Sequence, residues 1–288
     1  MIAYLLLVHQ YPNQFKKLFQ AIHHADNVYL IHVDKKTDES VFNEIEAFLS
    51  DYGNAHLLER KVTNRGGYSL VDAELRGIET LLKLSMKWQY FINLSGQDLP
   101  LQSQQAIYTF LKAHPHTDFM GLTDQRALRP DTLHRIEHYV FETGANITSV
   151  GPTRQHSYLS DVTPYIGSKW MILSRKFCDF VVRHPDVDRF KTFYKNTFMA
   201  DEGFFQTVLM NTSYRQEAVV EDDLREIEWL PAEGDAPPRP RILGLADEAM
   251  LAQSERLFAR KFDETIDADI IEQLSQRMIQ ANKLPQQA

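Results

Sequence analysis

A carboxylate pair late in the chain could act on a hydroxyl group. Asp201 and Glu202 stand directly before the apolar run 204–209. A carboxylate at the wall of a pocket can act as a general base, because it accepts the proton that a reacting hydroxyl gives up. The pattern alone favours another interpretation, in which acidic residues only complement the positive end of a helix.

Two basic clusters follow, and they could hold an anion. One consists of Arg239 and Arg241, and the other of Arg256, Arg260 and Lys261. Arginine offers a forked donor and lysine a point charge, and both suit phosphate oxygens. Composition alone favours an ordinary solvated face for both clusters.

Residue spacing argues against most metal and nucleotide-cofactor chemistry. The two Asp-x-Asp triplets, at 186–188 and 267–269, do not follow strong strands, so we expect them on the surface. Asp34 does end a strand, but two lysines follow it. The chain has no His-Glu-x-x-His, no Gly-x-Gly-x-x-Gly and no Walker loop, which argues against zinc proteases, dinucleotide redox enzymes and P-loop enzymes. The residues by themselves therefore give no signal for a metal or a nucleotide cofactor.

The residue counts exclude further classes. The chain has 288 residues and a net charge of −8, which does not suit a general nucleic-acid binder. Cys178 is the single cysteine, which excludes an internal disulfide, a cysteine zinc site and an iron–sulfur cluster. It lies in an apolar run, so we expect a buried inert thiol in a protein of a reducing compartment. The apolar N-terminal run 1–9 is too short to span a membrane.

The first third of the chain alternates strands and helices that would position these residues. We expect strands at 3–8, 28–33, 55–58 and 90–94, and helices at 13–23, 40–49 and 71–84. This order predicts an α/β fold with a mostly parallel sheet covered by helices on both faces. Ligands of such sheets bind beyond the carboxyl ends of the strands. His9, Asp34 and the turn 95–98 are expected there.

The remainder of the chain is less regular. The polar segment 126–154 is expected to be a loop or an insertion over the site, and the proline-rich segment 231–240 a mobile linker. We expect a strand at 168–173 and a helix at 175–183 whose cap is Ser174. Further helices are expected at 201–209, at 251–258 and in the last ~20 residues, before a polar tail.

Seven sequence blocks, in order, resemble the core-2/I-branching β-1,6-N-acetylglucosaminyltransferases, a family that includes the peptide O-xylosyltransferases. The segments 110–165 and 225–245 match poorly. The blocks are 3–9 (AYLLLVH), 29–36 (YLIHVDKK), 66–71 (GGYSLV), 90–101 (YFINLSGQDLPL), 167–170 (GSKW), 200–207 (ADEGFFQT) and 257–263 (LFARKFD).

The resemblance implies a single glycosyltransferase domain over residues 1–288, with a GT-A-type fold. Residues 1–105 would bind the nucleotide sugar, 106–265 would carry the acceptor and catalytic half, and 266–288 a C-terminal helix and tail. The implied reaction inverts the anomeric carbon without a metal. The family's base falls on Glu202 and its diphosphate lysine on Lys261. The partner arginine is either Arg239 or Arg241.

Further site residues come from the same resemblance. Asp34 would contact the nucleoside, and Val8 with His9 would line the uracil pocket. Two more donor contacts fall on Gly67 and Asp98, although Asp98 would equally well brace the turn before Pro100. Trp229 and Arg135 fall on the acceptor side. Trp229 would stack on the acceptor sugar or, equally well, pack as a lid.

Two departures from the family pattern bear on function. Arg65 stands where the family usually has an aromatic residue, which puts the local donor contacts and the donor sugar in question. The chain also lacks the N-terminal anchor and the disulfides of the animal Golgi enzymes. It therefore resembles a bacterial, cytoplasmic relative whose acceptor is a polysaccharide, lipid-linked or capsular saccharide.

Four functions are weighed on this basis. The first is transfer of N-acetylglucosamine from UDP to an acceptor hydroxyl. The second keeps the transfer but uses UDP-xylose or another nucleotide sugar. The third is a nucleotide-sugar-binding protein without activity, and a Rossmann oxidoreductase is the least favoured. The expected partners are a UDP-sugar and a glycan or lipid-linked acceptor, with no nucleic acid, no transmembrane segment and at most peripheral membrane contact.

Overall fold

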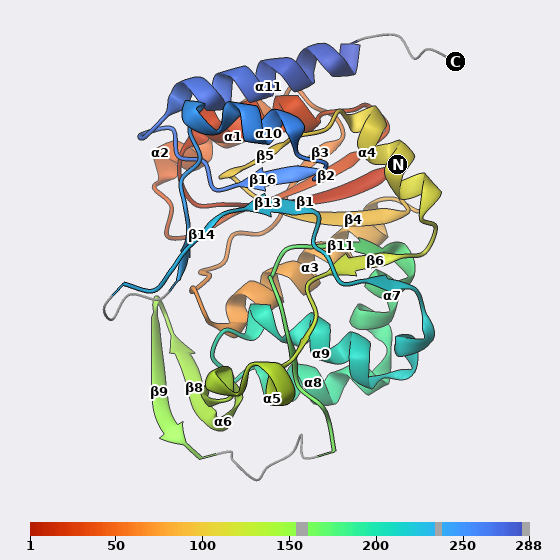
Figure 1. The fold of residues 1–288 in the computed structure, drawn as a ribbon, viewed down its shortest axis with the longest axis vertical. Coiled ribbons are helices and arrows are strands. Elements are labelled where there is room, and N and C mark those ends of the chain that lie inside the picture. Colours follow the sequence, from red (N-terminus) through yellow and green to blue (C-terminus); the bar gives the residue numbers. More distant parts are fainter. Residues whose placement is uncertain (154–160, 234–237, 284–288) are drawn as a thin grey trace.

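A seven-stranded sheet organises the chain. The structure, a computed structural model, describes residues 1–153, 161–233 and 238–283. The strand order is β12-β6-β11-β4-β1-β2-β3 (Figure 1). The bounds are β1 Ile2–Val8, β2 Val28–Val33, β3 Ala55–Leu57, β4 Tyr90–Ser95, β6 Asp118–Met120, β11 Met171–Ser174 and β12 Val219–Val220. Within this sheet, β11 is the strand that runs antiparallel to its neighbours. The predicted α/β class with a mostly parallel sheet is confirmed.

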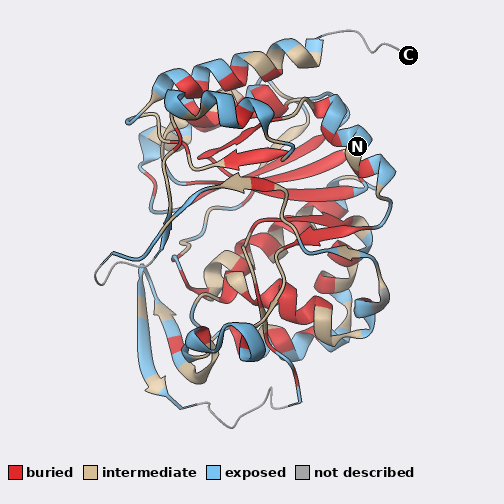
Figure 2. Ribbon diagram, in the orientation of Figure 1, coloured by how far each residue is buried: buried red, intermediate tan, exposed pale blue. Residues whose placement is uncertain are grey.

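Helices cover both faces of this sheet, which explains why its strands are continuous apolar runs. Every residue of β1 is buried. Tyr4, Leu6 and Val8 pack in one apolar cluster, while Ala3, Leu5 and Leu7 pack in another on the opposite face. Figure 2 shows the buried sheet between exposed outer helix faces. The first cluster involves α1 Pro12–Ile22, α2 Glu39–Leu49, α4 Gln104–Ala113, α10 Glu248–Gln253 and α11 Ala268–Lys283, and the second α3 Tyr68–Leu84, α7 Arg175–Arg183, α8 Asp188–Tyr194 and α9 Phe204–Asn211.

The segment 126–154 is more ordered than expected, so its prediction as a loop is wrong over the described part. It contains α5 Gln125–Leu128, the 3₁₀ turn η1 Pro130–Thr132 and α6 His134–Glu137. The antiparallel hairpin of β8 His138–Thr143 and β9 Asn146–Pro152 follows. Gly144 turns this hairpin with φ +57°, which glycine adopts at little cost. The segment's last residue, Arg154, lies outside the described residues.

Two expected helices in the last third are corrected. The helix expected at 251–258 ends at Gln253, and Phe258–Arg260 instead forms β16, because buried Phe258 and Ala259 join a second sheet. That sheet has the order β13 (Arg225–Ile227), β16, β5 (Asp98–Pro100). The helix expected at 201–209 is broken at Gly203 into the 3₁₀ turn η3 (Ala200–Glu202) and α9.

The expected linker 231–240 is flanked by paired strands. β14 (Trp229–Leu230) pairs antiparallel with β15 (Arg239–Pro240). This pairing makes a hairpin, although residues 234–237 lie outside the described part. The ends of the segment are therefore fixed by backbone hydrogen bonds, which a count of prolines could not show.

Other expectations hold. Ser174 caps α7, since its hydroxyl accepts a 3.2 Å hydrogen bond from the Phe177 amide, and Cys178 is a buried free thiol whose pKa is raised by burial. In the Asp-x-Asp triplets, Asp186, Asp188 and Asp269 are exposed and Asp267 is partly exposed. Among helices of the described residues, none is long and apolar enough to cross a membrane.

The remaining short elements complete the fold. They are β7 Thr123–Asp124, β10 Tyr165–Ile166, η2 Pro185–Val187, η4 Ser213–Gln216 and η5 Leu245–Asp247.

Candidate active site

The carboxyl ends of three neighbouring strands form one edge of the candidate site. In the parallel register, Val8 of β1 lies beside Val33 of β2, and Leu7 lies beside Ser95 of β4. The Asp34 amide donates to the Val8 carbonyl at 2.8 Å, and the Gly96 amide donates to the Leu7 carbonyl at 3.1 Å. The ends that we expected to meet therefore do meet, as the parallel topology requires.

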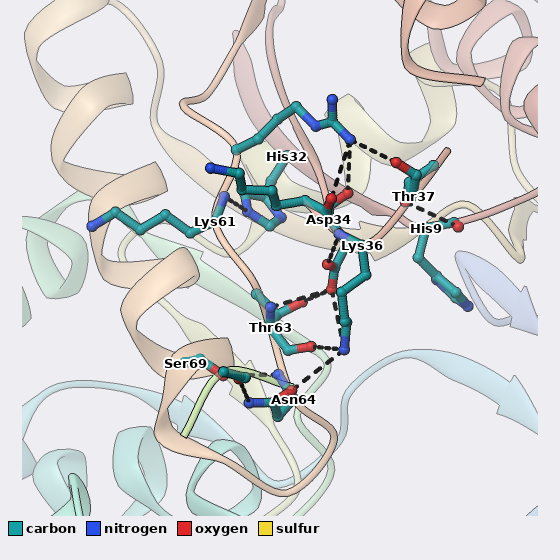
Figure 3. Close-up of polar contacts among 12 residues, drawn as sticks. His9, His32, Asp34, Lys36, Thr37, Lys61, Thr63, Asn64 and Ser69 are labelled. Atoms are coloured by element: carbon teal, nitrogen blue, oxygen red, sulfur yellow. Dashed lines mark hydrogen bonds and ion pairs between the residues drawn. The ribbon is translucent and has the colours of Figure 1, made fainter. Parts of the chain in front are cut away.

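Asp34 is fixed by hydrogen bonds at this edge. Its buried carboxylate accepts from the amides of Lys36 at 2.8 Å and Thr63 at 3.2 Å, and from the Thr63 hydroxyl (Figure 3). The Lys36 ammonium lies 3.8 Å from it. The neighbouring His9 carbonyl accepts from the Thr37 hydroxyl at 3.1 Å. These bonds hold the loops after β1 and β2 in one arrangement.

Asp98 braces the turn after β4. One carboxylate oxygen accepts from the Ser95 amide at 2.6 Å, and the other lies 2.9 Å from the Arg260 guanidinium. Asp98 is fully buried, and Arg260 stacks over the Trp170 ring at 4.2 Å. The sequence left two roles open for Asp98, a donor contact and a brace for the turn before Pro100. The contacts seen here are those of a brace.

The predicted diphosphate cations lie in different surroundings. Lys261 follows Arg260 at the end of β16, and its pKa is lowered by desolvation and then by Arg260. Arg241 is engaged by Asp247 at 2.5 Å and Glu228 at 2.6 Å, whereas Arg239 is exposed on β15. The choice between these two arginines stays open.

Glu202 makes an ion pair with Arg135, 67 residues away in the chain. The Arg135 Nη1 atom lies 2.7 Å from Glu202 Oε2, and both side chains are partly exposed. Two segments fix the backbone here, since the Gly167 amide donates to the Glu202 carbonyl at 2.9 Å and the Met199 amide to the Gly66 carbonyl at 2.7 Å. The structure thus joins a predicted base to a predicted acceptor residue.

Two buried carboxyl groups, Asp201 and Glu74, lie close enough to interact electrostatically. Burial, with smaller charge effects, raises the pKa of Asp201 to about 6 and that of Glu74 to about 8. Asn93 of β4 donates to one oxygen of Glu74 at 2.8 Å. Glu74 and Asn93 gave no sequence signal, because they sit inside an ordinary helix and strand pattern.

Gly67 makes room for a carboxylate at the N-terminus of α3. A Cβ atom on Gly67 would lie 2.3 Å from Glu142 Cδ. The Glu142 carboxylate accepts from the Ser69 amide at 2.8 Å, from the Ser69 hydroxyl at 2.6 Å and from Asn64 at 2.8 Å. A negative charge is favoured at this end of a helix. In this structure, Gly67 therefore contacts β8, and the sequence did not single out Glu142.

The predicted acceptor residues lie on short elements outside the sheet. Trp229 is 56% exposed on β14, and Arg135 belongs to α6, next to β8. The hairpin of β8 and β9 and the hairpin of β14 and β15 lie along the same side of the molecule (Figure 1). Within residues 1–153, 161–233 and 238–283, no group of three or more His, Cys, Asp or Glu is placed to hold a metal ion.

Comparison with known proteins identifies the family. Residues 2–252 match the family model described as "Core-2/I-Branching enzyme", and the chain belongs to this family. It is 29% identical over 291 residues to a xylosyltransferase of Ciona intestinalis, covering 95% of this chain and 33% of that protein. It is 30% identical over 293 residues to xylosyltransferase 1 of Canis lupus familiaris, covering 95% and 30%. The human xylosyltransferase 2 is 30% identical over 291 residues, covering 94% and 33%.

The chain therefore spans about a third of the length of the curated relatives that it matches. Among solved structures, mouse xyloside xylosyltransferase 1 in its apo form is similar at 11% identity. Its TM-score is 0.38, over 76% of this chain and 84% of that one.

Proposed function

We propose that this protein is a metal-independent, inverting glycosyltransferase of GT-A type that moves a sugar from a UDP-sugar to an acceptor hydroxyl. The observation that carries the proposal is the place of Glu202. The Glu202 carbonyl accepts a hydrogen bond from the Gly167 amide. Lys169, two residues after Gly167, accepts a 2.9 Å hydrogen bond at its carbonyl from Asn93 of β4. A partly exposed carboxylate is thereby held near the carboxyl end of the sheet, where ligands of parallel sheets bind.

Each residue then has a role in the transfer. Arg135 holds the Glu202 carboxylate at 2.7 Å and leaves its other oxygen to accept the proton of the acceptor hydroxyl. The acceptor oxygen forms a bond to C1 of the sugar as the bond from C1 to the diphosphate oxygen breaks. UDP leaves with that electron pair, and Lys261 with Arg239 or Arg241 stabilises its charge. Asp34, Val8 and His9 would hold the uridine.

The donor sugar has two candidates. The family resemblance favours N-acetylglucosamine, while the names of the relatives, xylosyltransferases, favour UDP-xylose. We retain both, and a panel of UDP-sugars in a hydrolysis and transfer assay separates them. For the acceptor we propose a glycan or a lipid-linked saccharide. The bacterial, cytoplasmic setting stays a prediction from the single cysteine and the resemblance.

The substitution Glu202→Gln tests the proposed reaction. We expect transfer to fall by roughly 10²–10⁴-fold, with UDP binding retained, because the amide keeps the shape but cannot take the proton. EDTA should leave the wild-type rate intact. Glu255→Gln, at an exposed site, is the matched control. Full activity of Glu202→Gln or a strict requirement for Mn²⁺ would contradict the proposal. UDP binding without turnover on any donor would favour a binding protein.

A further inference from the structure

We propose that Lys169 binds the diphosphate of the donor and stabilises the leaving group between Lys261 and the base. The inference rests on the proposed function, and it adds a cation to a set that so far holds Lys261 and one arginine. Three independent features of the structure lead to it: the backbone around Lys169, the surroundings of its ammonium group and the charges that it influences.

The backbone places Lys169 between the base and the sheet edge. On one side, the Gly167 amide donates to the Glu202 carbonyl at 2.9 Å, and the Gln206 amide group donates to the Ser168 carbonyl at 2.8 Å. On the other side, Asn93 of β4 donates to the Lys169 carbonyl at 2.9 Å and accepts from the Met171 amide at 2.9 Å. The segment 167–171 therefore connects the catalytic carboxylate to the strand end.

Close packing fixes this segment further. A Cβ atom on Gly167 would lie 1.9 Å from the carbonyl oxygen of Gly121, so no other residue fits without a backbone shift. Hydrogen bonds on both sides and a close backbone contact fix the backbone at Lys169, and the Trp170 ring lies beside its ammonium group. A preorganised charge stabilises a developing negative charge without the cost of reorganisation.

The ammonium group of Lys169 has no fixed counter-ion among the described residues. Its Nζ atom lies 4.7 Å from the centroid of the Trp170 ring, and Arg260 stacks on the same ring at 4.2 Å. Arg260 is neutralised by Asp98 at 2.9 Å. Within the part of the chain that the structure describes, Lys169 makes no ion pair within 4 Å. Its charge thus stays available for a ligand.

The influence of Lys169 extends to both halves of the site. After desolvation and Lys261, it is the next cause that lowers the pKa of His9 at the end of β1. It also opposes the rise that burial causes in the pKa of Asp201, next to Glu202, and of Glu74. The charge of Lys169 therefore acts both on His9 of the proposed donor region and on Asp201 beside the proposed base. In the proposed reaction, the bond from C1 to the diphosphate breaks where these two regions meet.

A purely structural role of Lys169 would account for part of these observations. The test must therefore separate a structural role from binding of the diphosphate. In that alternative, Lys169 only keeps the buried Asp201 ionised. Its loss would then change stability and its pH dependence but would leave the affinity for phosphate groups unchanged. The ligand series uridine, UMP and UDP isolates the phosphate contribution, because its members share the nucleoside.

We therefore expect Lys169→Met to weaken UDP binding by about tenfold or more in calorimetry, with uridine affinity unchanged. Tenfold corresponds to about 1.4 kcal/mol. Lys169→Arg should recover most of the UDP affinity, since it restores the charge. Lys112→Met, on the exposed surface of α4, is the matched control and should bind like the wild type. The turnover of Lys169→Met should fall more than its KM for the acceptor changes.

Each outcome separates the inference from the proposed function. Wild-type protein that binds neither UDP nor UDP-sugars overturns the proposed function. Wild type that binds UDP, with equal affinity in a folded Lys169→Met, overturns only the role of Lys169. Circular dichroism and urea midpoints establish folding. If Lys169→Met does not fold, Lys169→Arg and Lys169→Gln decide, because UDP affinity should follow the charge at position 169.

Discussion

The sheet edge that we propose binds the donor and the two hairpins that we propose face the acceptor are built in different ways. At this sheet edge, Asp34 and Asp98 are buried, and both carboxylate oxygens of Asp98 accept hydrogen bonds from protein groups. On the hairpins, Trp229 is 56% exposed and Phe141 38% exposed. Figure 2 shows this contrast between a buried sheet and largely exposed hairpin strands. The core thus fixes the proposed donor edge, whereas local strands form the proposed acceptor region.

Hydrogen bonds at Val140, Glu142 and Gly144 attach the hairpin of β8 and β9 to the body. Val140 exchanges hydrogen bonds with Asn196, at 3.0 and 3.1 Å, and Glu142 binds the N-terminus of α3 at 2.8 Å. Regions with few buried contacts open at lower free energy than a core does. Substitutions in the two regions should therefore have different effects. Those in the sheet should lower the stability of the fold, and those in the hairpins should change the use of the acceptor.

The largest effect is expected for Phe91→Ala, near the start of β4. Phe91 is fully buried, so the truncation should lower the free energy of unfolding by about 3–5 kcal/mol. Phe141→Ala on β8 is the matched control and should cost less than about 1 kcal/mol. Urea unfolding measures both. Equal losses of unfolding free energy in the two variants would show that the hairpin is part of the core. That result would contradict the difference between the sheet and the hairpins.

The second effect concerns the buried carboxyl group of Glu74. Its pKa is about 8 in the folded protein, against an ordinary value of 4.5. The folded state therefore holds the proton more tightly, and stability is lost as pH rises from about 4.5 through 8. Glu74→Gln should make this decline shallower by on the order of 2 kcal/mol.

Urea midpoints at pH 5 and pH 8.5 measure that decline. Asp118, with a pKa of about 7, acts in the same direction and stays in both proteins, so the decline should persist in part. An identical pH profile for wild type and Glu74→Gln would show that Glu74 is not the group that titrates.

The third effect concerns the attachment of the hairpin. Glu142→Gln removes the negative charge at the N-terminus of α3 and should cost about 1 kcal/mol. The loss should appear locally, as faster amide hydrogen exchange in β8 and β9 with little change in β1 and β4. Glu221→Gln, at an exposed position, serves as the control. Faster exchange throughout the sheet would argue against a separate attachment.

The smallest effect on the fold is expected for Trp229→Ala. Because Trp229 is exposed on β14, stability should change by less than about 0.5 kcal/mol. If the indole stacks on the acceptor sugar, the KM for the acceptor should rise about two- to tenfold, as expected for a lost aromatic contact of about 0.5–1.5 kcal/mol. Trp229→Phe should restore most of it. A changed KM for the donor would place Trp229 in the other half of the site.

The sequence by itself determined the sheet and its ligand-binding edge. The apolar runs of β1, β2 and β4 predicted buried strands, and the order of elements predicted parallel pairing, because both signals are local. The cap at Ser174 followed from residue type in the same way. The expectation that His9 and Asp34 lie at the ligand-binding edge needed only the order of the elements, since parallel topology brings strand ends together.

Only the tertiary structure decided which distant residues meet. Arg135 and Glu202 pair across 67 residues, and the Glu142 carboxylate fills the space over Gly67. The segment of Lys169 links the backbone of Glu202 to β4. Phe258, expected at the end of a helix, instead begins β16, because β5 and β13 provide hydrogen bonds to that strand. Such contacts depend on how separate segments pack, and local periodicity carries no record of that packing.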